Sequence, residues 1–347
     1  MSLLHAILDG ESLITPDLLS RQLRPVVSRN DEHRLAIAGD QLTLALGIAR
    51  QRFESGSAAA RVVEDLSRHL HEIRSNCDAG IWSILVAKAQ QHPVREHLFQ
   101  DPFTRWSFDK PRGYSGDAHL LDFIYGCEAV ASSVEDSTPL GREIYAYTRN
   151  ASSSVAVRER RDLLAHHVDR LHAEKGSSLE VLTIAAGHLR EAERSSALAE
   201  GGISRWTAID QDPASVEEIR RTYAETPVEP IEGSVKGILS NAYQLGHFDF
   251  AYAAGLYDYL PRAVAVKLTR KAMELLKPRG VYLFANFAQG IAVDGYMETF
   301  MNWELLLRSE AEMWDIINAS VDRNMVDATV EPGENGNILY GIIRMRT

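Results

Sequence analysis

The sequence predicts an α/β fold: a mainly parallel, seven-stranded sheet that ends in an antiparallel hairpin and is preceded by an all-helical domain. Three observations predict it. The first half of the chain has apolar residues at helical spacings of three and four, whereas strands and helices alternate from Leu179 onward. The chain then ends in two strand-like segments joined by a Gly/Asn turn, which is typical of a hairpin. Alternating strands and helices favour a parallel sheet that is covered on both faces.

The helical half has a clear end in the sequence. Three of its segments predict helices: 31–54, 58–77 and 142–176, the last with a break near Ser152–Ser154. The residues at 174–178, "EKGSS", stop the last helix. We therefore expect a helical cap or lid domain over residues 1–175 and a sheet domain over residues 176–347.

The sheet half predicts strands and helices in turn. Its expected strands cover residues 179–187, 204–210, 228–235, 247–255, 281–287 and the two arms of a hairpin at 327–346. Two of its helices carry start signals, because Asp212 precedes Pro213 and Ser309 stands three residues before Glu312 in a capping box. The segment 277–280, "KPRG", is expected to close a helix before the fifth strand.

Composition excludes several classes of function. The chain has 347 residues and a formal net charge of −11, from 37 basic and 48 acidic residues, which argues against nucleic acid as a partner. Its cysteines, Cys77 and Cys127, give neither a disulfide framework nor a cysteine-rich metal site, and no histidine spacing suggests a metal. The N-terminal residues lack a basic leader, and no run reaches the roughly 20 apolar residues of a membrane helix. We expect a cytoplasmic protein without metal or membrane contact.

Four consecutive strand ends carry residues suited to a nucleoside. Ala185–Gly187 lies at the end of the first strand and lets backbone N–H groups approach a ligand. Asp210 ends the second strand, 23 residues after Gly187, where a ribose-binding acid would lie. Ser234 and Val235 follow the third strand and could contact an adenine, and residues 252–260 end the fourth, at the reacting end. A dinucleotide would need more glycines to bind its pyrophosphate. A single glycine fits S-adenosyl-L-methionine (SAM) better, since SAM has no phosphate.

A group of motifs then resembles one family. The motifs are "DKPRGYSGDAHLLDFIYG", "TIAAGHLRE", "AIDQDP", "GSVKGIL", "FDFAYAAGLYDYL", "LKPRGVYLFANF" and "MNWELLLRSEAEM". Together they resemble a bacterial branch of the class I SAM-dependent methyltransferases, which includes hydroxypalmitate methyl ester synthases and the SAM-cyclising azetidine-2-carboxylate synthases. The resemblance runs from about residue 101 to the C-terminus. It departs at Ala185 and His188, which replace common glycines.

The resemblance implies a Rossmann-like catalytic domain with a helical cap, and SAM as methyl donor or sole substrate. The residues expected to bind it are Arg112, Ala185, Gly187, His188, Asp210, Gln211, Ser234, Val235, Gly255, Leu256 and Tyr259. In the loop "PRGYSGD", Arg112 would meet the SAM carboxylate, while Tyr114 and Asp117 would lie near its sulfonium and amine. The alternative is that Asp117 only caps the next helix and Tyr114 packs between domains.

The expected catalytic set has two halves. Tyr114 and Asp117 come from the loop "PRGYSGD", and the aromatic residues Tyr252 and Tyr257 come from the end of the fourth strand. An aromatic face can hold a sulfonium cation, but such rings are as often core residues. We expect an enzyme of specialised metabolism that methylates a carboxylate or hydroxyl oxygen of a small molecule. Two alternatives stay open: cyclisation of SAM by its own α-amine to azetidine-2-carboxylate and methylthioadenosine, and a SAM-binding protein without activity. A homodimer also stays open.

Overall fold

The computed structural model describes residues 29–346, and side chains from residue 32 onward. The expectation that the N-terminal residues 1–13 are no signal peptide therefore lies outside the described residues. Contacts divide the chain into two compact units: a sheet unit of residues 156–289 and 305–346, and a helical unit that includes residues 29–155 and 290–304. The sequence placed a single boundary at residue 175. The contacts instead group residues 156–175 with the sheet and residues 290–304 with the helices.

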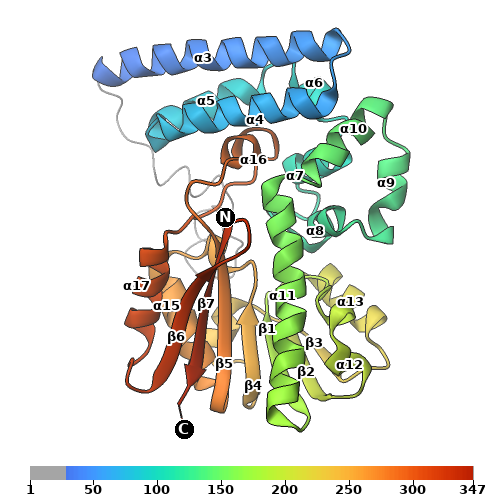
Figure 1. The fold of residues 1–347 in the computed structure, drawn as a ribbon, viewed down its shortest axis with the longest axis vertical. Coiled ribbons are helices and arrows are strands. Elements are labelled where there is room, and N and C mark those ends of the chain that lie inside the picture. Colours follow the sequence, from blue (N-terminus) through green and yellow to red (C-terminus); the bar gives the residue numbers. More distant parts are fainter. Residues whose placement is uncertain (1–28, 347) are drawn as a thin grey trace, which may run out of the picture. The chain divides into compact units, whose positions relative to one another are not determined.

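The sheet unit contains one seven-stranded sheet in the order β3-β2-β1-β4-β5-β7-β6 (Figure 1). Its strands are β1 (Leu179–Ile184), β2 (Ile203–Asp210), β3 (Val228–Glu232), β4 (Phe248–Ala253), β5 (Leu276–Phe287), β6 (Val326–Pro332) and β7 (Ile338–Met345). Strands β1 to β5 pair in parallel, and β7 runs antiparallel to both β5 and β6. This is the α/β fold that the sequence predicts, a mainly parallel, Rossmann-like sheet with a terminal antiparallel hairpin.

The helices of the sheet unit are α11 (Ser152–Lys175), α12 (Ser196–Ala199), α13 (Pro213–Thr222), α14 (Val235–Leu239), α15 (Arg262–Glu274) and α17 (Glu310–Ser320), with the 3-10 turns η2 (Ala192–Arg194) and η3 (Tyr257–Tyr259). Two of them, α13 and α17, begin where the sequence places their start signals. The Asp212 side chain accepts from the Ala214 N–H at the start of α13, and Ser309 with Glu312 forms the predicted capping box.

One predicted boundary in the sheet unit is wrong. The segment 277–280 lies inside β5, which begins at Leu276 where this residue pairs with Phe248, instead of separating helix from strand. Arg279 there has a left-handed φ of 65°, and the register of β4 with β5 shifts at the same place. The Pro and Gly therefore mark an irregularity near the start of a strand, where such residues are also tolerated.

The helical unit has no strand among its described residues. Its helices are α3 (Arg29–Glu54), α4 (Ala59–Ser75), α5 (Ala79–Gln90), α6 (Arg95–Leu98), α7 (Pro102–Asp109), α8 (Ala118–Tyr125), η1 (Glu128–Val130), α9 (Ala131–Glu135), α10 (Pro139–Thr148) and α16 (Asp294–Phe300). The predicted break is confirmed, since α10 ends at Thr148 and α11 begins at Ser152. Helix α16 packs on α4 and α5, and Arg74 of α4 forms ion pairs of 3.0 Å with Asp294 and 2.7 Å with Glu298.

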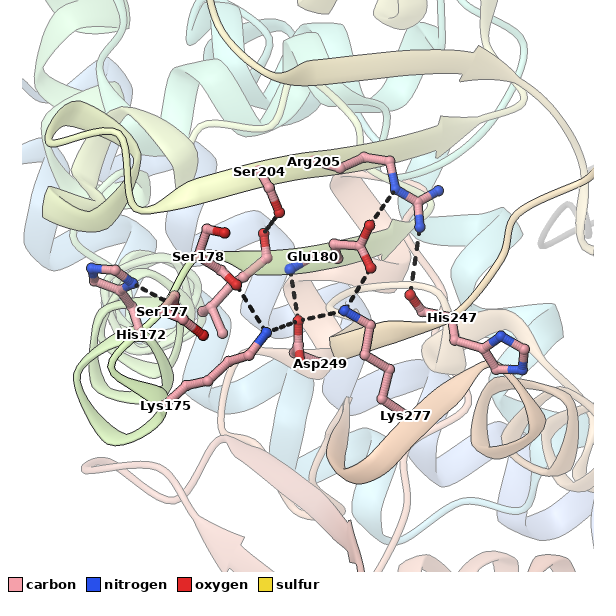
Figure 2. Close-up of polar contacts among 11 residues, drawn as sticks. His172, Lys175, Ser177, Ser178, Glu180, Ser204, Arg205, His247, Asp249 and Lys277 are labelled. Carbon is pink, nitrogen blue, oxygen red and sulfur yellow. Dashed lines mark hydrogen bonds and ion pairs between the residues drawn. The ribbon is translucent and has the colours of Figure 1, made fainter.

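An ion-pair network connects the amino ends of four neighbouring strands, β2, β1, β4 and β5 (Figure 2). Asp249 of β4 lies between Lys175, at 2.9 Å, and Lys277, at 3.0 Å. Glu180 of β1 lies between Lys277, at 2.5 Å, and Arg205 of β2, at 3.3 Å. Burial raises the pKa of Asp249, but the hydrogen bonds that it accepts from Lys175, the Glu180 N–H and Lys277 lower the pKa by more, so the net shift is downward. The hydrogen bond from Lys277 also lowers the pKa of Glu180. These charges stabilise the folded sheet.

Candidate functional site

The turn after β1 has an unusual backbone. Ala185, Gly187 and Leu189 all have left-handed φ angles, of 58°, 56° and 53°. Only glycine adopts this region without steric cost, so Ala185 and Leu189 are held there by their surroundings. The Ala186 N–H donates to the Ile209 carbonyl at 3.0 Å, and the Gly187 N–H donates to the Asp210 carboxylate at 2.7 Å. The turn is thus fixed against the end of β2.

Asp210 links the ends of three strands. Its carboxylate accepts from the N–H groups of Gly187 and, at 2.8 Å, Asp212, and its carbonyl accepts from the Gly233 N–H at 2.8 Å. Burial raises the pKa of Asp210 to about 6, although these N–H groups and the nearby His188 oppose the shift. The carboxylate is therefore ionised at neutral pH in a site that penalises its charge. His188 is buried beside it, and Gln211 is exposed.

The loop after β3 is held close to the same point. Ser234 caps the short helix α14 by accepting from the Gly237 N–H, and its own N–H donates to the Tyr243 hydroxyl at 3.0 Å. A Cβ on Gly237 would lie 2.2 Å from that hydroxyl oxygen, so the loop approaches Tyr243 too closely for a larger residue. Val235 is half-buried at the start of α14. The structure thus brings together the predicted residues at the ends of β1, β2 and β3.

Two of the predicted catalytic tyrosines, at the end of β4, are core residues. Neither Tyr252 nor Tyr257 has any exposed surface. The Tyr252 hydroxyl donates to Glu191 at 2.6 Å, and the Tyr257 hydroxyl lies 2.6 Å from Thr269 and 2.9 Å from that of Tyr282. Rings that are enclosed and whose hydroxyls are already paired do not face a ligand. The structure therefore does not support the catalytic contacts predicted for them, because sequence spacing does not distinguish a site aromatic from a core aromatic. Gly255, Leu256 and Tyr259, the cofactor residues predicted there, are half-buried.

The sequence missed a buried arginine at this edge. Arg160 of α11 is 5% exposed, and its Nη1 donates to the Ala254 carbonyl at 2.8 Å, directly after β4. A Cβ on Gly255 would lie 3.6 Å from its Nη2. Among the described residues, this guanidinium makes no second hydrogen bond and no ion pair, although it has five N–H donors. Its sequence position, in an ordinary amphipathic run, gives no signal.

A second missed group fixes the turn η3 to β5. Arg308 donates to the Tyr257 carbonyl at 2.6 Å and also to the Leu260 carbonyl and the Asn286 side chain. Asp258, inside that turn, is 2% exposed and accepts from the Phe287 N–H at 2.7 Å. Burial raises the pKa of Asp258 to about 7, against the opposing effects of this N–H, Arg160 and Arg308. The only sequence signal was that both residues belong to motifs of the family resemblance.

The predicted lid residues lie in the helical unit. Asp117 caps α8 by accepting from the Leu120 N–H at 3.0 Å, and its other oxygen accepts from the Trp106 indole at 3.0 Å. The capping role weighed for Asp117 is therefore confirmed. The Arg112 Nε lies 3.9 Å from the Asp117 carboxylate. The contacts expected of Arg112, Tyr114 and Asp117 with SAM stay predictions.

The described residues contain no group of three or more His, Cys, Asp or Glu side chains arranged to hold a metal ion. Within the same part of the chain, the helices are all too short or too polar to span a membrane.

Comparison with solved structures supports the fold. The chain resembles the crystal structure of a "possible exported protein" from Bordetella parapertussis, with 15% identity, a TM-score of 0.52, and coverage of 89% of this chain and 97% of that one. The N-methyltransferase NodS of Bradyrhizobium japonicum WM9, in complex with S-adenosyl-L-homocysteine, has 15% identity, a TM-score of 0.39, and coverage of 62% and 98%. The magnesium protoporphyrin IX methyltransferase ChlM of Synechocystis PCC 6803, with bound SAM, has 13% identity, a TM-score of 0.39, and coverage of 56% and 83%. The first of these likenesses shows a shared fold. No protein-family model and no curated protein matches the chain.

Proposed function

We propose that the sheet unit binds SAM at the carboxyl ends of β1 to β4 and transfers its methyl group to a carboxylate or hydroxyl oxygen of a small molecule in bacterial specialised metabolism. One observation carries the proposal: the buried Asp210 carboxylate lies at the carboxyl end of β2, and the buried Arg160 guanidinium lies at the carboxyl end of β4, on the same edge of the sheet. Neither group has an ion-pair partner among the described residues. SAM has a ribose diol toward one end and a carboxylate at the other, which are complementary to these two groups.

Asp210 supports the ribose end. A carboxylate only accepts hydrogen bonds, and it accepts those from hydroxyls more strongly than a neutral group does. Its two N–H partners use part of the capacity of its oxygens, which have about four lone-pair sites. Ser234 and Val235, at the end of the next strand, are the proposed adenine contacts, with His188 and Gln211 beside the ribose.

Arg160 supports the amino-acid end. A buried charge is costly unless it is paired, and a carboxylate can accept two parallel hydrogen bonds from a guanidinium. The sequence assigned this role to Arg112. We propose Arg160 for it, because its guanidinium already lies at the β4 end and makes a single hydrogen bond there.

The chemistry that SAM supplies is an electrophilic carbon on a sulfonium. The contribution of this chain is positioning and exclusion of water, which suffice for a carboxylate acceptor. A hydroxyl acceptor must also lose a proton, and Asp258 is the residue at this edge whose pKa, about 7, suits proton transfer near neutral pH. The same property would suit loss of a proton from the α-amine in the alternative cyclisation reaction.

The experiment that tests the proposal is incubation of the purified protein with SAM, alone and with a panel of hydroxy acids and fatty acids, with products analysed by mass spectrometry. Methyl transfer predicts intact SAM in the first sample, and S-adenosyl-L-homocysteine with a methylated acid in the second. Methylthioadenosine with azetidine-2-carboxylate from SAM alone would replace methyl transfer by cyclisation. Binding of SAM without turnover in any sample would identify an inactive SAM-binding protein, and absence of binding would overturn the site.

A further inference from the structure

Glu191 is a buried acid at the carboxyl edge of the sheet. It lies between the turn after β1 and η2, and it forms no ion pair among the described residues. One of its oxygens, Oε1, accepts a hydrogen bond from the Tyr252 hydroxyl at 2.6 Å. Burial raises the pKa of Glu191, although this hydrogen bond, its own N–H, Arg160 and Arg161 oppose the shift. Tyr223, which is also nearby, is neutral because burial raises its pKa further from its usual value.

Glu191 lies where the strand order of the sheet reverses. In the order β3-β2-β1-β4-β5, the chain adds β2 and β3 on one side of β1 and then β4 and β5 on the other. Open α/β sheets bind ligands at such a point, beyond the carboxyl ends of the strands. Glu191 follows β1, and Tyr252 stands one residue before the end of β4. The Tyr252 ring stacks on that of Phe250 with centroids 5.2 Å apart, so its hydroxyl is held in place toward Glu191.

Arg160 lies near two buried carboxyls at this point. Its charge acts to lower the pKa values of both Glu191 and Asp258, which shows that the guanidinium is close to each. It nevertheless forms an ion pair with neither, and its hydrogen bond goes to the Ala254 carbonyl. A buried cation and a buried anion that lie near each other without pairing are complementary to a ligand with both charges. The α-amino acid end of SAM is such a group.

We propose that the Glu191 carboxylate accepts hydrogen bonds from the α-ammonium of SAM, beside Arg160 on the α-carboxylate, and thereby directs the enzyme to methyl transfer instead of cyclisation. This role rests on the proposed function, which places SAM at this edge. Tyr252 is then a positioning residue that acts through Glu191.

The chemistry of the amine gives the reason. Cyclisation requires that the ammonium first lose a proton to water. The freed lone pair then forms a bond to the γ-carbon, and the carbon–sulfur bond breaks with its electron pair leaving on methylthioadenosine. A carboxylate beside the nitrogen favours the ammonium form, which has no lone pair. Glu191 would therefore suppress attack by the amine while the methyl group stays available to an acceptor.

The direct test compares two ligands that differ only in the amine. S-adenosyl-L-homocysteine and its desamino analogue, which keeps the carboxylate, are titrated calorimetrically into the wild type, Glu191→Gln and Glu193→Gln. Glu193 is the matched control, because its side chain is 43% exposed and pairs with Arg190 at 2.8 Å. The wild type and the control should bind S-adenosyl-L-homocysteine about 30-fold more tightly than the analogue, and Glu191→Gln should lose most of this preference.

Two contrary outcomes are distinct. If Glu191→Gln keeps the wild-type preference for the amine, Glu191 does not bind the ammonium, although the SAM site stands. If the wild type binds neither ligand, the SAM site itself is wrong and this role fails with it. Tyr252→Phe is the second variant, should Glu191→Gln not fold. It keeps the carboxyl and removes its hydrogen bond, so the preference should fall by about threefold; an unchanged preference would contradict the positioning role.

Incubation with SAM alone tests the effect on the reaction, with azetidine-2-carboxylate measured by mass spectrometry. Glu191→Gln should form this product about 10-fold faster than the wild type, because a neutral amide does not stabilise the ammonium as a carboxylate does. Glu193→Gln should match the wild type. Equal rates in the wild type and Glu191→Gln would overturn the control of reaction type by Glu191.

Discussion

The carboxylates at the two edges of the sheet differ in ion pairing and in the direction of their pKa shifts. At the amino edge, Asp249 and Glu180 each lie between two basic side chains, and their pKa values are lowered (Figure 2). At the carboxyl edge, Asp210 and Asp258 are more deeply buried, have no ion pair among the described residues, and have pKa values raised to about 6 and 7. Arg160 is buried there with one hydrogen bond. Ion pairs therefore stabilise the charged side chains at the amino edge, whereas burial destabilises the charged side chains at the carboxyl edge.

This difference distinguishes a structural network from a binding site. Buried charges without partners cost free energy, and that cost is recovered when a complementary ligand arrives. Perturbed pKa values therefore gather where a protein binds or reacts, although structural networks can produce them as well. We therefore predict that changes at the amino edge affect stability alone, and that changes at the carboxyl edge affect ligand binding first.

The largest effect is expected from Asp210→Ala. It removes the acceptor proposed for the ribose and the anchor of the Gly187 N–H, so affinity for SAM should fall by about 100-fold or more. Calorimetric titration measures it, with the melting temperature as a check on folding. Unchanged affinity in a folded variant would mean that SAM does not bind at this strand end.

Arg160→Met should separate binding from stability. Affinity for SAM is expected to fall by about 30-fold, because the carboxylate loses its partner. The melting temperature of the free protein should change little, since a buried charge with a single hydrogen bond is replaced by an apolar side chain of similar length, while the buried carboxyls of Asp258 and Glu191 lose only the longer-range effect of that charge. Arg170→Met on the same helix is the control, because Arg170 is half-exposed and pairs with Glu174. Loss of stability in Arg160→Met with unchanged affinity would make Arg160 structural.

Asp249→Asn is the converse change at the amino edge. It breaks ion pairs with Lys175 and Lys277, so the free energy of unfolding should fall by about 1–2 kcal/mol near neutral pH. Because the folded pKa of Asp249 is lowered, this stabilisation is present above the unfolded pKa and is lost as the pH falls through the folded pKa. Denaturant unfolding measures the change. An altered SAM affinity would contradict the separation of the two edges.

Asp258→Asn should change how stability depends on pH. The pKa of Asp258 in the folded protein, about 7, lies above its value in the unfolded chain. Between these two pKa values the folded protein binds more protons than the unfolded chain, so the Asp258 carboxyl destabilises the folded protein increasingly as the pH rises toward 7. The variant should therefore be more stable than the wild type by about 1–2 kcal/mol near pH 8 and by less near pH 5. Denaturant unfolding at the two pH values checks this. A difference that does not vary with pH would show that Asp258 has an ordinary pKa.

Ala185→Gly gives the smallest effect. Glycine adopts the left-handed φ of 58° without steric cost, so the variant should be more stable by up to about 1 kcal/mol, less the entropy that glycine loses on folding. Thermal unfolding measures it. Marked destabilisation would show that the methyl group of Ala185 has a packing role.

The sequence predicted the features that depend on local pattern. Strand and helix order, the caps at Asp212 and Ser309, and the approach of the Gly187 turn to Asp210 all follow from spacing and residue type. Arg160 was missed because its place depends on how α11 packs against β4, far along the chain. The structure does not support a catalytic contact for Tyr257 for a similar reason: an aromatic after a strand can turn toward the ligand edge or into the core, and only tertiary packing decides.

Calorimetric titration of S-adenosyl-L-homocysteine into the wild type and Arg160→Met tests the central claim most directly, together with the melting temperature of each free protein. We predict saturable binding to the wild type, about 30-fold weaker binding to the variant, and a melting temperature in the variant that is nearly unchanged. Equal affinity in both proteins, or no binding to either, would contradict the assignment of the carboxyl edge as a SAM site.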